Sequence, residues 1–114
     1  MNERPDYKNH PLWNLAMSLT RDAYAVAERL RENEPEIGFR LRKAAVAVPA
    51  HVASALASGD DKRVEHMLAA RAALAEVSRQ AGRIRAPGCE ELASAAEGLD
   101  RAVLFEFGAA EVVS

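Results

Sequence analysis

The chain has 114 residues and a formal net charge of −2, which is enough for one domain with a buried core and too little for two. Hydrophobic residues make up 49% of it and aromatic residues only 5%, while alanine, the best helix former, accounts for about a fifth. The slight acidity excludes the bulk basic character of a typical nucleic-acid-binding domain, and a single cysteine, Cys89, excludes an internal disulfide.

The first residues, through Lys8, are mostly polar and contain no apolar run of the kind found in a secretory signal. No later segment is apolar for long enough to span a bilayer. We therefore expect a cytoplasmic protein without membrane association.

A first helix is predicted over residues 10–31. Asn9 can cap its N-terminus, and Pro11 falls in the first turn, where a missing N–H costs nothing. Pro35 ends this segment, because proline disfavours helical backbone at the preceding residue. Between these signals, apolar residues recur at steps of three and four: Leu12, Leu15, Leu19, Ala23, Val26 and Leu30.

A second helix is predicted over residues 35–57, with Pro49 in its interior. Such a proline costs about 3 kcal/mol, and a short strand over 44–48 is the alternative. The apolar spacing continues in phase through Pro49, which favours a kinked helix. Two apolar stripes run along it, one with Leu41, Ala44, Ala45, Val48, Val52, Ala55 and Leu56, the other with Phe39, Val46, Ala50, Ala53 and Ala57.

Two further helices are predicted over residues 60–84 and 87–107, separated by Ala86-Pro87-Gly88. Gly59 and Gly108 are expected to lie just beyond the ends of the second and fourth helices. Four helices of about 20 residues with short connections predict an all-α, antiparallel, up-down-up-down four-helix bundle. We expect this single domain to span residues 1–114, with a proline-kinked second helix.

Second apolar stripes also occur on the first and third helices. A surface helix needs only one stripe, and contiguous exposed apolar residues usually mark an interface. We therefore predict homo-oligomerisation. The candidate interface residues are Trp13, Met17, Tyr24, Phe39, Val46, Ala50, Ala53, Leu68 and Ala72.

Motifs for catalysis or metal binding are not found. Di-metal bundles need Glu-x-x-His, and none of His10, His51 and His66 has a glutamate three residues before it. The sequence also has no phosphate-binding glycine loop, nucleophile elbow or zinc spacing. We expect a non-enzymatic protein with no catalytic residues, metal or cofactor, in which Cys89 is an inert thiol and His51 a structural polar group.

Five basic residues are candidates for phosphate binding, because the arginine guanidinium matches phosphate geometry. They are Arg40, Arg42, Lys43, Arg79 and Arg83. Salt bridges to a neighbouring subunit explain them about as well, since acidic residues dominate from Glu90 onward. Both interpretations remain open on the sequence alone.

The segment Leu41-Arg42-Lys43-Ala44-Ala45-Val46-Ala47-Val48-Pro49-Ala50, preceded by Gly38, resembles the central signature of a bacterial family. This is the four-helix-bundle family of 23S ribosomal RNA intervening-sequence proteins, which includes accessory proteins of diversity-generating retroelements. Leu12-Trp13 with Ala16 and Tyr24 looks like the first helix of that family, and residues 69–76 resemble its third.

The resemblance implies an antiparallel bundle assembled as a homopentamer. It also implies binding of RNA, DNA or a reverse transcriptase through basic surface residues, where Arg42 and Lys43 match the paired basic residues of the signature. After Pro49 the chain departs from the family pattern. His51 stands where the family usually has Asn, and Ala53-Ser54-Ala55 stands in place of Ala-Glu-Gly.

Overall fold

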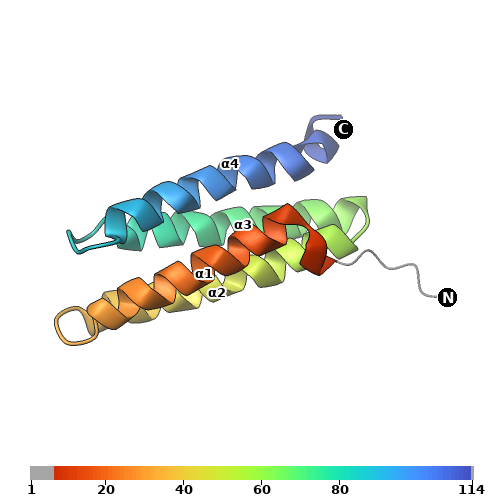
Figure 1. Ribbon diagram of the computed structural model, residues 1–114. Helices are drawn as coiled ribbons and strands as arrows, with labels where there is room; N and C mark the ends of the chain where they lie inside the picture. The colour runs from red at the N-terminus through yellow and green to blue at the C-terminus, as the bar shows by residue number, and fades with distance from the viewer. Residues whose placement is uncertain (1–6, 114) are drawn as a thin grey trace.

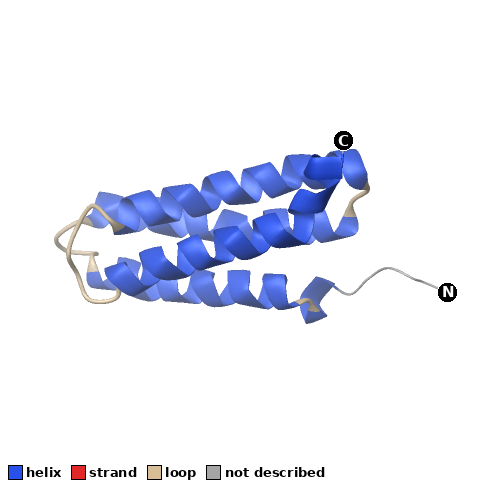
Figure 2. Ribbon diagram, turned by 90° about the horizontal axis from the view of Figure 1, so that it is seen from above, coloured by secondary structure: helices blue, strands red, loops and turns tan. Residues whose placement is uncertain are grey.

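The computed structural model describes the backbone of residues 7–113 and the side chains of residues 7–108. Within that part of the chain all regular structure is helical, without strands (Figure 2). The prediction of an all-helical chain with four α-helices is confirmed. The elements are the short 3-10 helix η1 (Tyr7–Asn9), α1 (Pro11–Arg29), α2 (Pro35–Ala57), α3 (Asp60–Ala81) and α4 (Cys89–Val113).

The four α-helices lie side by side along their lengths, with short connections at the two ends (Figure 1). The α1–α2 and α3–α4 connections lie at one end, and the α2–α3 connection lies at the other. Each helix packs extensively on the next along the chain, whereas α1 and α4 meet much less. None of the described helices combines the length and hydropathy that a bilayer-spanning segment requires.

Helix α2 is continuous through Pro49, so the strand considered for residues 44–48 is wrong. The imide nitrogen of Pro49 has no hydrogen and cannot donate to the carbonyl of Ala45, four residues earlier. The hydroxyl of Thr20 on α1 donates to that carbonyl instead, at 3.1 Å. A neighbouring helix thus supplies the donor that the proline removes.

The core follows the predicted stripes closely, with one correction on α1. Leu15, expected in the core, is 52% exposed, and the adjacent Ala16 is fully buried. Leu15 lines a groove between α1 and α4, where the two helices make little contact. The largest fully buried side chains are Leu41, Met67, Leu74, Leu92, Val48, Val52, Val77 and Val103.

Several helix ends differ from the prediction, and α1 ends at Arg29 instead of residue 31. His10 rather than Asn9 caps α1, because its Nδ1 accepts a hydrogen bond from the Leu12 N–H at 3.1 Å. Helix α3 ends at Ala81 instead of residue 84, since the N–H of Arg83 bonds three residues back and tightens the last turn.

Helix α4 begins at Cys89 instead of residue 87, directly after Gly88, whose φ of 91° is outside the helical region. It continues past Gly108 to Val113, so the predicted end at 107 is wrong. A glycine costs a helix interior only about 1 kcal/mol relative to alanine, which does not by itself end a helix.

Candidate interaction surface on α2 and α3

The second apolar stripe of α2 is exposed, as its pattern predicts. Phe39 is 55% exposed, Val46 and Ala50 are also exposed, and Ala53 is half-buried. On α3, Leu68 and Ala72 are exposed. These residues form no part of the core, so both helices present apolar side chains to solvent.

Two shallow grooves flank α3 and are lined by some of these residues, namely Phe39, Leu68 and Ala72, whereas Val46, Ala50 and Ala53 line neither groove. The α2–α3 groove, about 680 Å³ in volume, is lined by Phe39, Arg40, Lys43, Ala44, Ala72, Ala73 and Glu76. The α3–α4 groove, about 740 Å³, runs along the other side of α3 and is lined in part by Leu68, Ala72 and Ala75. Ala72 borders both grooves, so the exposed stripe of α3 forms the ridge between them. We call the two grooves and this ridge the α2–α3 face.

The candidate interface residues of α1 lie elsewhere. Trp13 and Met17 are half-buried, and the Trp13 indole packs against the core and meets the Tyr7 ring edge-on, with centroids 5.6 Å apart. Thr20 of the same stripe bonds to α2, so this stripe follows the α1–α2 seam. Tyr24 is exposed. The structure brings Phe39 and Ala72 into one groove and does not bring the α1 residues to it.

Two exposed apolar residues of α4 were missed from the sequence. Phe105 is 87% exposed, and its neighbour Leu104 is also exposed. The last three core positions described on this helix are Leu99, Val103 and Phe107, spaced by four. Leu104 and Phe105 fall between these positions. The helical period could therefore have predicted from the sequence that both side chains are exposed to solvent.

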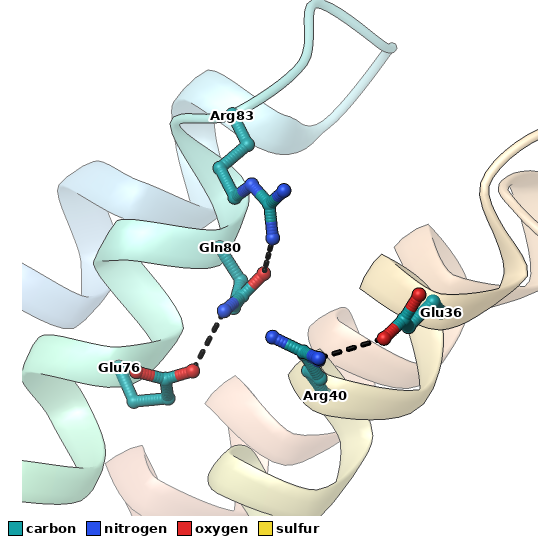
Figure 3. Close-up of polar contacts among 5 residues, drawn as sticks. All are labelled: Glu36, Arg40, Glu76, Gln80 and Arg83. Carbon is teal, nitrogen blue, oxygen red and sulfur yellow. Dashed lines mark hydrogen bonds and ion pairs between the residues drawn. The ribbon is translucent and has the colours of Figure 1, made fainter.

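A polar cluster of five residues, drawn in Figure 3, lies at one end of the α2–α3 groove. Arg40 Nη2 donates to Glu36 Oε2 at 2.7 Å on α2. On α3, the buried Gln80 donates to Glu76 Oε2 at 2.7 Å, and Arg83, just beyond the end of the helix, donates to Gln80 Oε1 at 3.2 Å. Figure 3 shows Arg40 reaching from α2 toward the α3 members.

Three of the five basic candidates therefore have partners within their own chain. Arg40 pairs with Glu36, Arg79 pairs with Glu76, and Arg83 contacts Gln80. The spacings of three and four residues were visible in the sequence and are typical of helix-surface pairs. The charges of Arg40 and Arg79 are therefore partly compensated before any external ligand binds, whereas the amide that Arg83 contacts is neutral.

The other two basic candidates, Arg42 and Lys43, are not side by side. Lys43 is exposed in the α2–α3 groove, and no ion pair of its ammonium occurs among the described residues. Arg42 is half-buried and does not line that groove. Adjacent helical residues point about 100° apart, so the five basic residues do not make one patch.

The α3–α4 groove contains an ion pair and a further hydrogen bond that use acidic side chains of α4. Arg71 holds Asp100 with two hydrogen bonds, Nε to Oδ1 at 2.8 Å and Nη2 to Oδ2 at 3.3 Å. The hydroxyl of Ser78 donates to Glu97 Oε2 at 3.2 Å. Asp100 and Glu97 of α4 therefore have partners on α3 of the same chain. From the sequence, the acidic residues of this region were candidates for salt bridges to a neighbouring subunit.

The reactive side chains are dispersed. Cys89 is buried at the start of α4, and His10 caps α1. His51 and His66 are the exception, because their rings lie 6.2 Å apart across α2 and α3. Sequence spacing gave no signal for this pair, since the two residues come from different helices. No group of three or more potential metal ligands occurs among the residues that the structure describes.

The chain was compared with known proteins at three levels. No family matches it, and neither a curated protein nor a solved structure does. The α2–α3 face is the candidate functional site, because exposed apolar side chains, small residues and a charged groove end occur together there.

Proposed function

We propose that the chain is a non-enzymatic helical scaffold that assembles with copies of itself through the α2–α3 face. The observation that carries this proposal is the exposure of Phe39 and Leu68 along two grooves that are lined in part by alanines. Contiguous exposed apolar residues of this kind usually mark a protein interface. Alanines such as Ala72 let a partner helix approach closely, and the ion-paired groove end adds polar specificity.

The proposal includes the architecture and setting that the sequence suggests. The bundle is antiparallel and up-down-up-down, which the alternation of its connections between two ends supports. Pro49 kinks α2, supported by the loss of one helical hydrogen bond. We place the protein in the cytoplasm, in the family of 23S ribosomal RNA intervening-sequence proteins, as a homopentamer. These points are supported by the single cysteine and by the signature around Pro49.

The test is the solution mass by light scattering and sedimentation. The wild-type chain is expected to be an oligomer, and Phe39→Asp is expected to dissociate it, because a carboxylate would be desolvated in the interface. Phe105→Asp is the matched control, since Phe105 is more exposed and lies outside the α2–α3 face. A monomeric wild type overturns the proposal, and dissociation by the control alone moves the interface to α4.

A second candidate function is binding of structured nucleic acid or of a nucleoprotein such as a reverse transcriptase. Lys43 favours it, because this exposed cation and the exposed aromatic residue Phe39 line the same groove between α2 and α3. The joint substitution Arg42→Ala and Lys43→Ala should then weaken RNA or DNA binding. It should also make binding less dependent on salt. The slope of the logarithm of the binding constant against the logarithm of the salt concentration should become shallower by about one unit for each phosphate that the variant no longer neutralises.

The same double variant separates the two functions. A protein-only scaffold predicts that it disturbs assembly and that the wild type binds no RNA or DNA even at low salt. Lys62→Ala is the matched control, because Lys62 is exposed near the start of α3 and lines neither groove of the α2–α3 face. If Lys62→Ala also loses nucleic-acid binding, the binding depends on the overall positive charge of the surface and not on the α2–α3 face.

A further inference from the structure

We propose that His51 and His66 form a two-histidine site for a divalent transition-metal ion of the zinc, nickel or copper class. The inference is independent of the proposed assembly. The pair lies toward the α2–α3 connection, whereas the polar cluster occupies the other end of the same two helices.

The two helices fix the separation of the imidazoles. His51 lies in the second half of α2, His66 lies in the second turn of α3, and Ser58 and Gly59 alone connect the helices. The α2–α3 packing is the most extensive between any two described helices. The ring centroids are 6.2 Å apart and the ring planes differ by 31°. The packing of the two helices therefore holds the two imidazoles near each other before an ion arrives.

The distance suits a shared metal ion. With metal–nitrogen bonds of about 2.0–2.1 Å, one ion can join imidazoles whose ring centres are up to roughly 6.5 Å apart, and about 5 Å apart in tetrahedral geometry. The observed 6.2 Å lies inside that reach. Rotation about the side-chain torsions closes the remaining gap for tetrahedral coordination.

The imidazole nitrogens are available for coordination. Both side chains are half-buried, and neither has a hydrogen-bond or ion-pair partner among the described residues. Imidazole prefers zinc, nickel and copper to magnesium and calcium, which take oxygen ligands. No third His, Cys, Asp or Glu joins the pair in the described part of the chain, so water completes the coordination.

The experiment titrates zinc chloride or nickel chloride into the full-length chain without a polyhistidine tag. Calorimetry should give one ion per chain, and the ion should raise Tm, because it binds the folded pair and links α2 to α3. Magnesium chloride should do neither. His51→Ala and His66→Ala should each abolish the heat of binding and the rise in Tm, while the matched control His10→Ala should retain both.

A second measurement separates loss of the site from loss of fold. Nickel should broaden the imidazole NMR signals of His51 and His66 in the wild type and leave those of His10 sharp. Circular dichroism of the two alanine variants should give the wild-type helix content. The proposal is overturned if the wild type binds no ion, if both variants bind like the wild type, or if His10 alone is broadened.

Discussion

The hydroxyl of Thr20 donates a hydrogen bond to the carbonyl oxygen of Ala45, which Pro49 leaves without a helical donor. Ala45 is fully buried, so water cannot replace that donor. The same hydroxyl lies 2.9 Å from the carbonyl of Ala16 on its own helix, and its proton is shared between the two. The interior proline is therefore tolerated where α1 packs against α2.

Replacing Thr20 with valine should destabilise the protein, because the shape of the side chain is kept and only the hydroxyl is removed. A buried carbonyl left without a donor costs about 1–3 kcal/mol in the free energy of unfolding. In a Pro49→Ala background the restored N–H of residue 49 takes over, so Thr20→Val should cost much less there. Urea denaturation of the four proteins measures this coupling.

Thr20→Ser is the matched control, since it keeps the hydroxyl and should lose little of the stability that valine removes. Equal losses from Thr20→Val in the proline and alanine backgrounds would show that the hydroxyl does not compensate for the proline.

Gly38→Ala should lower Tm despite the better helix propensity of alanine. A Cβ at residue 38 would lie 3.2 Å from the carbonyl oxygen of Ala27 and 3.4 Å from its Cα, so α1 would have to move. Overpacking of this kind costs about 1–3 kcal/mol, against a propensity gain of about 1 kcal/mol.

Gly98→Ala is the opposite case and serves as the control. The nearest atom to a Cβ there is the end of the flexible Arg101 side chain at 3.8 Å, so the propensity gain of about 1 kcal/mol should raise Tm. A Gly38→Ala protein as stable as Gly98→Ala would mean that the α1–α2 contact is not close-packed.

Much of this fold was predictable from the sequence. Apolar residues at steps of three and four predicted where the helices lie and also which face of each helix is mostly buried. Leu15 was misplaced since it adjoins Ala16, and a period alone cannot say which of two neighbours packs inward. The His51–His66 pair and the Arg71–Asp100 ion pair depend on which helices become neighbours. Contacts of this kind depend on the tertiary arrangement of the helices, which the spacing of residues within one helix does not predict.

Asp100→Asn should weaken the packing of α3 against α4 by removing the charge that Arg71 holds with two hydrogen bonds. The two side chains are 30% and 35% exposed, so solvent screens the pair and the loss of stability should be about 1 kcal/mol or less at low salt. That loss should shrink at high salt. Glu28→Gln, in the exposed pair with Arg31, should leave the urea midpoint unchanged.

Substituting both Glu36→Gln and Glu76→Gln should strengthen binding of structured RNA at low salt, relative to the wild type. Arg40 and Arg79 would lose their intramolecular carboxylates and become available to phosphate. Fluorescence anisotropy over a salt series measures the effect, which should appear as a steeper salt dependence. Glu65→Gln is the control, because it releases Lys62 outside the α2–α3 face. Unchanged binding in the double variant would mean that Arg40 and Arg79 do not contact phosphate even when their carboxylate partners are removed.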